Sequence, residues 1–412
     1  MRVVDVEGLA GHLEGLAASE PEGPRVVVSG NHATPWPLLA AFDRAVERYR
    51  LFVLNAQPGV PDRDGVVLET PFVGAGMRRS PRLRYLPSRL SLVPRLFGAT
   101  VPPDVVLLHT TAPRDGQVSL GVEVNVLPAA VEAVRARGGL VVAQLNPAMP
   151  WTSGDAVLST DLVDLGVEVD QPLSAGHAVP PDDDALAIGA RVAALVGDGA
   201  TLQTGIGAVP DATLHALTQR RGLRVWTETF SDGVLGLERA GALDPEHPVV
   251  ASFLFGSDEL YAWAHDNPRL TMLRTERTNA PALIAQQPAM TSINSALQVD
   301  LFAQANASRI NARIYSGFGG QTDFIVGAMH SPGGQAVIAL RSWHPRANCS
   351  TVVALVDEPV TSFQHSSIIS EQGRAQIWGA DQCEQARQII EQVAHPDVRD
   401  ELREEARALG LT

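Results

Sequence analysis

Short apolar, β-rich runs alternate with amphipathic helical stretches along most of this 412-residue chain. Apolar residues recur at helical spacing in segments such as PLLAAFDRAVERY, LPAAVEAVRARG and PDATLHALTQRRG, and a glycine ends the last two. Because a parallel strand needs a crossover helix before its neighbour, this alternation predicts an α/β fold with mostly parallel sheets. We expect strands at 25–29, 104–110, 139–145, 200–204, 223–227, 249–254 and 352–356.

The length of the chain predicts two domains, since it exceeds what one ordinary core accommodates. The segment QPLSAGHAVPPDDD (171–184) is rich in proline and aspartate, as linkers are, and its last acids favour the start of a helix. We therefore expect domains at 1–184 and 185–412. VVVSGNHATPWPLLAAF and ATLQTGIGAVPDATLHAL have the same layout of strand, small-residue loop, proline and helix, which suggests that the two domains are related.

The chain contains no lysine, and all 32 of its Lys and Arg residues are arginine. This excludes Schiff-base catalysis, a lysine-bound pyridoxal phosphate and the lysine of a phosphate-binding P-loop. Any anionic ligand must be bound by arginine, backbone amides or helix N-termini.

Bulk properties exclude several further classes. A formal charge of −14 argues against nucleic-acid binding, and no apolar run approaches the ~20 residues that cross a bilayer. The first 24 residues lack a signal-peptide layout, so a cytoplasmic protein is expected. Cys349 and Cys383 are too few for a disulfide framework. Cys349 is expected to be buried and inert, since a nucleophilic role would need a nearby histidine and His344 is near only in sequence. No HxxxH, HExxH or CxxC spacing occurs, so we predict no metal.

One glycine-rich loop follows a predicted strand at 200–204. It contains Gly205, Ile206 and Gly207, with Pro210 at an expected first helical position. Glycines at such a turn let backbone amides approach a ligand, and a helix start favours negative charge. A tight turn without any ligand is the alternative, because the motif does not match GxGxxG.

Two further segments carry residues suited to chemistry. Glu228 ends another predicted strand, and a helix begins nearby with Ser231 or Asp232 as its cap. Carboxylates at the ends of parallel strands lie where such folds bind ligands, but a nucleophile, a base, a metal ligand and a helix-start acid all fit. The segment 316–324 has three glycines in four residues, which suits either an amide presented to an oxyanion or a hairpin turn.

Together, TGIGAVPDATLHAL, TETFSDGVLGLERAG and SGFGGQTDF resemble the acetyl-CoA hydrolase/transferase family. The resemblance continues through VPPDVVLLHTTAPRDGQVSLGVEVN, LNPAMPWTSGD and TSINSALQVDLFAQAN, in the same order and over most of the chain. The family includes acetate, succinate, butyrate and 4-hydroxybutyrate CoA-transferases. It implies two CoA-transferase-type α/β domains, an active site in the cleft between them, and a homodimer.

The resemblance also implies a mechanism. The nucleophilic glutamate of the family falls on Glu228, which would attack an acyl-CoA and then carry CoA as a glutamyl thioester. CoA would be a substrate, with no tightly bound cofactor and a carboxylic acid as its partner. An acyl-CoA hydrolase that uses the same glutamate is the alternative, and a non-catalytic ligand-binding protein is a third possibility.

Other site residues follow from the resemblance alone. The oxyanion amide falls on Gly320, Asn279 and Glu371 fall near the reaction centre, and Arg346 lies near a lysine that contacts CoA in relatives. Trp151 replaces an expected arginine, which favours an uncharged or apolar acyl tail. The CoA-binding loop falls on Gly205, Ile206, Gly207, Ala208 and Val209.

Two further sequence features concern Trp226 and a cluster of arginines. Trp226 stands where many members have histidine. Six arginines concentrate between residues 78 and 95, where they suit either CoA phosphates or, as we favour, a solvated or subunit-contact surface: Arg78, Arg79, Arg82, Arg84, Arg89 and Arg95.

Overall fold

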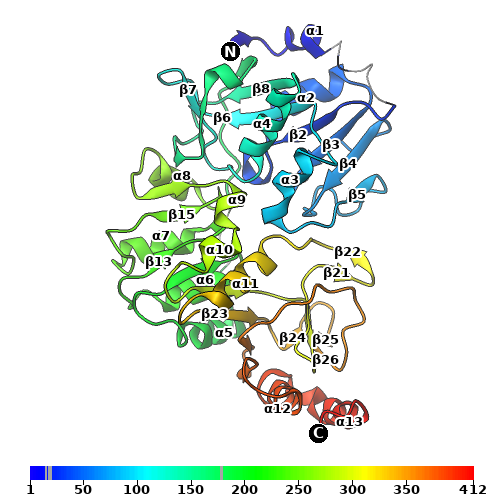
Figure 1. Ribbon diagram of the computed structural model, residues 1–412, viewed down its shortest axis with the longest axis vertical. Helices are drawn as coiled ribbons and strands as arrows, with labels where there is room; N and C mark the ends of the chain where they lie inside the picture. Colours follow the sequence, from blue (N-terminus) through cyan, green and yellow to red (C-terminus); the bar gives the residue numbers. More distant parts are fainter. Residues whose placement is uncertain (14–15, 17–20, 177–179) are drawn as a thin grey trace. The chain divides into compact units, whose positions relative to one another are not determined.

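The computed structural model describes residues 1–13, 16, 21–176 and 180–412 (Figure 1). The chain divides into two compact units, Met1–Gly176 with Val250–Thr278 and His177–Val249 with Asn279–Thr412. These units are discontinuous in sequence, because the segment after residue 249 returns to the first unit. The division into sequence domains at 1–184 and 185–412 stays a prediction.

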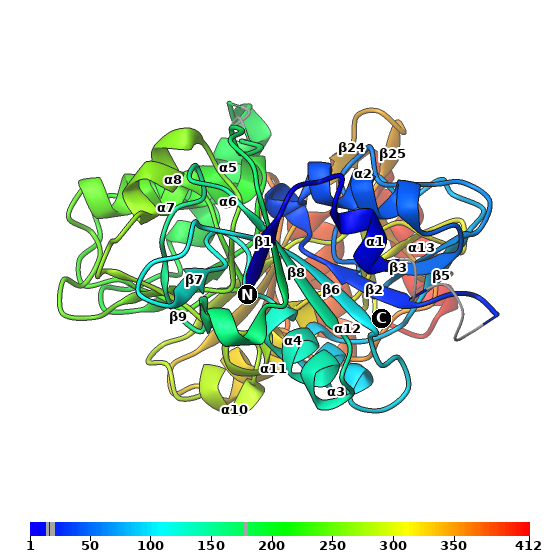
Figure 2. The same ribbon diagram turned by 90° about the horizontal axis from the view of Figure 1, so that it is seen from above.

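The first unit is built on an eight-stranded sheet whose neighbouring strands are all parallel. The two central strands are buried at every residue, as expected for a sheet covered on both faces. Figure 2 shows α2 (Trp36–Ala45) on one face, and α3 (Val93–Phe97) and α4 (Leu127–Ala136) on the other. In order, the strands are β1 (Arg2–Val4), β11 (Leu165–Glu168), β8 (Leu140–Leu145), β6 (Val105–Thr110), β2 (Arg25–Val28), β3 (Tyr49–Val53), β4 (Val66–Thr70) and β5 (Leu83–Tyr85).

The second unit is built on a six-stranded sheet in which five strands are parallel and the last is antiparallel. The carboxyl ends of the five parallel strands therefore share one edge, where open α/β sheets bind ligands. In order, the strands are β13 (Arg224–Val225), β12 (Thr201–Thr204), β18 (Thr291–Asn294), β23 (Gln335–Ala339), β27 (Ser367–Ile369) and β28 (Arg374–Gln376).

Helices cover both faces of this second sheet because its buried strands alternate their side chains. On β23, Val337 and Ala339 pack into one apolar cluster with α5 (Asp183–Ala193), while Ala336 and Ile338 belong to another with α11 (Gln321–His330). Helix α5 begins where the acids at 182–184 predicted, and its N-cap carboxylate accepts from the amide of residue 185.

Shorter elements complete each unit. In the first unit they include α1 (Leu9–Leu13), β7 (Gln117–Ser119), β9 (Ser153–Gly154), β10 (Val157–Ser159), β16 (Phe253–Leu254), α8 (Asp258–Ala264), β17 (Leu270–Met272) and α9 (Thr275–Thr278). In the second they include α6 (Ala208–Ala216), β14 (Thr229–Phe230), α7 (Asp232–Arg239), α10 (Pro281–Ile284), β19 (Gln298–Asp300), β20 (Ala305–Asn306), β21 (Arg309–Ile310), β22 (Arg313–Ile314), β24 (Trp343–His344), β25 (Cys349–Ser350), β26 (Val352–Val353), α12 (Gln382–Gln388) and α13 (Arg399–Ala408). Strand β15 (Val249–Ala251) spans a junction between the units.

Two features of the chain concern its surroundings. None of the helices in the described residues is long and apolar enough to span a bilayer. Cys349 and Cys383 are both exposed, so the expectation that Cys349 is buried is wrong. Cys349 lies on a short hairpin strand and Cys383 on the first turn of α12, and neither element is covered at these positions.

Candidate active site

Three predicted site residues meet in the second unit. Glu228 is half-buried in a bend that follows β13, and Asn279 is fully buried just before α10. The side-chain amide of Asn279 donates a hydrogen bond to Oε2 of Glu228, with an Nδ2–Oε2 distance of 2.7 Å. Gly320 is the N-cap residue of α11 and lies against both side chains.

Close approach explains why residue 320 is a glycine. Its φ of −94° is available to any residue, so the backbone conformation does not require glycine. A Cβ at Gly320, however, would lie 2.0 Å from Oε2 of Glu228 and 2.3 Å from Nδ2 of Asn279. The missing side chain therefore leaves the space that the carboxylate and the amide occupy. The loop leads into α11 and does not turn a hairpin, and a carboxylate near this helix start is electrostatically favourable.

The glycine-rich loop after β12 is open to its surroundings. Gly207 is the N-cap of α6 and has a φ of +118°, which favours glycine, while the Ile206 side chain is exposed. A Cβ at Gly205 or Gly207 would meet no described atom within 4 Å. Helix α6 begins at Ala208, so Pro210 is its third residue. The expectation that Pro210 is the first helical residue is therefore wrong. The first amides of α6 thus start beside unfilled space.

The carboxyl edge of the second sheet gathers the polar ends of its strands. Glu228 follows β13, the glycine loop follows β12, and Glu371 follows β27. Strand β27 is four strands from β13, so the two strands are separated by about 19 Å along the edge at ~4.8 Å per strand. The sheet thus places both glutamates in loops at the same edge, after strands that are not neighbours.

Glu371 is held by hydrogen bonds of its own. Its carboxylate accepts from the backbone amide of Ser342 at 2.9 Å, from the hydroxyl of Ser342, and from Nε2 of Gln372 at 3.2 Å. Burial acts to raise the pKa of Glu371, but the hydrogen bonds outweigh it and leave the pKa below its ordinary value. Glu371 is therefore an ionised, fixed acceptor.

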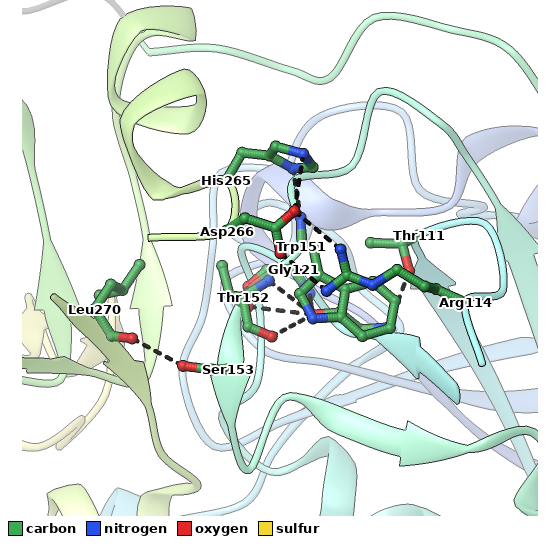
Figure 3. A network of polar contacts seen from close by, with 10 residues as sticks. Thr111, Arg114, Gly121, Trp151, Thr152, Ser153, His265, Asp266 and Leu270 are labelled. Atoms are coloured by element: carbon green, nitrogen blue, oxygen red, sulfur yellow. Dashed lines mark hydrogen bonds and ion pairs between the residues drawn. The ribbon is translucent and has the colours of Figure 1, made fainter. Parts of the chain in front are cut away.

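Trp151 lies in the first unit, within the polar network of Figure 3. The guanidinium of Arg114 stacks on its ring, 3.8 Å from the centroid, and binds both carboxylate oxygens of Asp266 at 2.9 Å. The backbone of Trp151 is fixed as well, since its N–H donates to Nδ1 of His265 and its carbonyl accepts from the amide of Asp266. A cation thus covers the indole, although no arginine stands at position 151.

Arg346 and the arginines at 78–95, which the sequence singled out, are not part of the network around Trp151. Arg346 is exposed in the turn between β24 and β25. Within the cluster at 78–95, Arg82 contacts Asp62 and Asp64, and Arg84 forms a two-pronged pair with Glu22. Part of the charge of this cluster is therefore already paired within the chain.

Sequence reasoning missed three partners. Arg114 and Ser342 gave no local signal, because each meets its partner, Trp151 or Glu371, only through the fold. A third case did carry a signal: TLQT and TSIN place polar side chains on buried strands. There Oε1 of Gln203 accepts from Ser292 at 2.8 Å and from Asn294 at 3.2 Å, next to the glycine loop.

Comparison with known proteins identifies the family of this chain. Residues 66–174 match the acetyl-CoA hydrolase/transferase N-terminal domain, and residues 256–406 match the acetyl-CoA hydrolase/transferase C-terminal domain. The succinyl-CoA:acetate/propanoyl-CoA:succinate CoA transferase of Fasciola hepatica is 34% identical, over 93% of this chain and 85% of its own length. The chain belongs to the acetyl-CoA hydrolase/transferase family.

Solved structures support the family assignment. RipA from Yersinia pestis is 27% identical and superposes with a TM-score of 0.90, covering 99% of this chain and 100% of RipA. The 4-hydroxybutyrate CoA-transferase abfT-2 from Porphyromonas gingivalis is 29% identical with a TM-score of 0.83, covering 99% and 98%. The predictions of the acetyl-CoA hydrolase/transferase family, of an α/β fold with mostly parallel sheets, and of an enzyme are confirmed.

Proposed function

We propose that this protein is a CoA-transferase that moves CoA between short-chain carboxylic acids through a glutamyl-CoA thioester on Glu228. The observation that supports it best is the contact of Glu228, Asn279 and Gly320, because a glycine is needed there only to make room for the carboxylate. The relatives named as CoA-transferases support the transfer of CoA as the reaction.

In the first step, a carboxylate oxygen of Glu228 attacks the thioester carbonyl carbon, the carbon–sulfur bond breaks, and CoA leaves as a thiolate. The product is a mixed anhydride between the acyl group and Glu228. An ionised carboxylate needs no base to become a nucleophile. Asn279 would hold the carboxylate in place and, with the Gly320 amide, stabilise the oxyanion that develops on the carbonyl oxygen.

In the second step, the thiolate attacks the carbonyl carbon of the Glu228 half of the anhydride and expels the first acid as a carboxylate. The resulting thioester stores the group-transfer energy of the donor. A second carboxylate then repeats the two steps in reverse order and leaves as the new acyl-CoA. Charge and atoms balance without a proton donor, and water must be excluded until the acceptor arrives.

CoA itself would bind at the carboxyl edge of the second sheet. Open space lies beside Gly205 and Gly207, where α6 begins, and a helix start suits a phosphate or pantetheine group in a chain without lysine. The exposed Arg346 would supply a mobile positive charge. A cytoplasmic homodimer is the state we expect for the working enzyme.

The acyl tail is proposed to be that of a monocarboxylate. Arg114 covers Trp151, but two nitrogens of its guanidinium already donate to the two carboxylate oxygens of Asp266. A second carboxylate on a substrate would have to displace that partner. This part of the proposal departs from the Fasciola hepatica relative, whose name includes succinate, because Trp151 stands where an arginine is expected.

The test is to incubate the protein with acetyl-, propionyl-, butyryl- and succinyl-CoA, each with and without a panel of acids. Intact-mass measurement should show a CoA adduct on Glu228 with a good donor alone, and new acyl-CoA only when an acid is added. Glu228→Gln, which keeps the shape of the side chain, should form neither. Free CoA released at one rate with or without acid would support the hydrolase instead, and full turnover by Glu228→Gln would contradict the nucleophile.

A further inference from the structure

A cavity of about 450 Å³ lies between the last helices of the second unit. It is lined by α12, by the π-helix Ile389–Val393 that continues it, and by α13 with the residues that follow. Helix α12 packs beside β28, where Oε1 of Gln388 accepts from the amide of Gln376 at 2.7 Å. Strand β28 is at one end of the six-stranded sheet, and β13, which precedes Glu228, is at the other. The cavity is therefore separate from the proposed acyl-CoA site.

The inner wall of the cavity is apolar. Ile390, Ala406 and Leu411 line it, are at most 5% exposed, and belong to one apolar cluster of the second unit. The volume is within the range of small-molecule pockets, and π-helical turns are rare and frequently lie at functional sites. An apolar wall in a cavity of this size suits an organic ligand and not a bare ion.

The carboxylates around this wall have partners within the chain. Arg387 forms ion pairs with Glu384 at 2.7 Å and with Glu391 at 2.9 Å. The carboxylate of Asp381 caps α12 by accepting from the amide of Glu384 at 2.9 Å. These acidic side chains therefore do not require a cationic ligand.

Arg407 differs from the other arginines of the lining. It is exposed in the last turn of α13, and its guanidinium has no ion pair or hydrogen bond with any described residue. Arg403, one turn earlier, is paired with Asp400 at 2.6 Å. The cavity thus combines an apolar wall with one unpaired positive charge.

We propose that this cavity binds a medium-chain monocarboxylate such as octanoate. The guanidinium of Arg407 would donate to both oxygens of its carboxylate. The alkyl chain would cover Ile390, Ala406 and Leu411, and each methylene removed from water tightens binding by up to about fourfold. A dicarboxylate or a phosphate is disfavoured, because a second negative charge would meet the apolar wall or the carboxylates of the lining.

Cys383 provides a local reporter for binding, because it is exposed and lines the cavity. Cys349→Ser leaves it as the only thiol of the full-length protein. The experiment measures the rate at which iodoacetamide alkylates Cys383, with octanoate added below its micelle-forming concentration. Octanoate should slow the alkylation with a saturating dependence on concentration. Hexanoate, which is two methylenes shorter, should need up to about 15-fold more acid for the same effect.

Two arginine variants of this single-thiol protein test the assignment of the charge. Arg407→Gln should weaken the binding of octanoate by about fivefold, which is the effect of an exposed ion pair, and leave that of octanol unchanged. Arg403→Gln is the matched control and should keep the affinity of its parent, because its charge is already paired. The proposal is overturned if octanoate does not protect Cys383, or if folded Arg407→Gln is protected as well as its parent. Octanol that protects the parent as strongly as octanoate does would overturn it too.

The outcomes are distinct from those that test the proposed function. Octanoate bound near Glu228 would leave Cys383 open to alkylation, and Glu228→Gln in the same background should be protected as its parent is. Arg407→Gln should transfer CoA between butyryl-CoA and acetate at the wild-type rate. Absence of a CoA adduct on Glu228 would therefore overturn the proposed function alone, and an unprotected Cys383 would overturn the carboxylate site alone.

Discussion

Substitution of Gly320 by alanine adds a single methyl group at the point where Glu228 and Asn279 meet. The backbone at 320 has φ −94° and ψ −1°, which alanine adopts without strain. At an N-cap position, glycine and alanine differ in their effect on stability by about 1 kcal/mol or less. The free energy of unfolding should therefore change little, and any loss of activity must come from the side chains that the methyl group displaces.

The structure sets the size of that displacement. The new Cβ would lie 2.0 Å from Oε2 of Glu228, and ordinary contact begins at 3.4 Å, so the oxygen has to move by about 1.4 Å. A misplacement of ~1 Å at a reacting group costs about 10²-fold in rate. The amide of Asn279, at 2.3 Å, must also move, which breaks the 2.7 Å hydrogen bond that orients the carboxylate. We expect Gly320→Ala to lower kcat by at least about 10²-fold.

The assay follows acyl-CoA exchange between butyryl-CoA and acetate, together with adduct formation by intact mass. Gly236→Ala is the matched control, because Gly236 is exposed on α7 and a Cβ there meets no described atom within 4 Å. The control should keep wild-type exchange and gain slightly in stability, as alanine does in a helix. Wild-type kcat for a folded Gly320→Ala would refute the argument from close approach, and loss of activity only in proportion to unfolding would refute it too.

Three further outcomes are expected. Asn279→Ala removes a hydrogen bond to the Glu228 carboxylate worth about 1.5–3 kcal/mol, so adduct formation in a rapid-mixing assay should slow by about 10- to 10²-fold. Burial raises the pKa of Glu123 to about 7, so the contribution of its protonated carboxyl group to stability is complete below about pH 4.5 and is lost as pH rises through 7. In urea unfolding, the free energy of unfolding of Glu123→Gln relative to that of the wild type should therefore rise by about 3 kcal/mol across this range. A difference that does not change with pH would contradict this. Asp266→Asn removes the carboxylate that binds the guanidinium of Arg114. The ratio of kcat/KM for succinyl-CoA to kcat/KM for butyryl-CoA should then rise by up to about fivefold, which is the effect of an exposed ion pair. An unchanged ratio would show that Arg114 does not contact the acyl group.

Local patterns predicted much of the architecture because they act over a few residues. Runs of β-branched residues between amphipathic stretches indicated the parallel sheets, and the acids at 182–184 indicated the start of α5. Ser231, one of two predicted caps, is the N-cap residue of α7. Exposure was harder to predict. Cysteines are usually buried, but Cys349 is exposed because its strand, β25, is not covered at this position.

The candidate site divides in the same way. Motifs placed Glu228, Asn279 and Gly320 on the list of site residues, but their spacing of 51 and 41 residues says nothing about contact. The 2.7 Å hydrogen bond and the filled space beside Gly320 exist because β13, α10 and α11 converge in one unit. Glu371 shows the opposite case, since the strand order sets it four strands from β13.

The sequence by itself determined which residue types are available for chemistry: a glutamate at the position of the proposed nucleophile, glycine loops, and arginine as the basic residue throughout, with no lysine. These are properties of single residues and short segments, so they survive without the fold. Only the tertiary structure decided that Arg114 covers Trp151 and is neutralised by Asp266, and that both ring nitrogens of His365 are buried without a hydrogen-bond partner among the described residues. Burial, pairing and close approach depend on residues far apart in the chain, and packing alone brings those residues together.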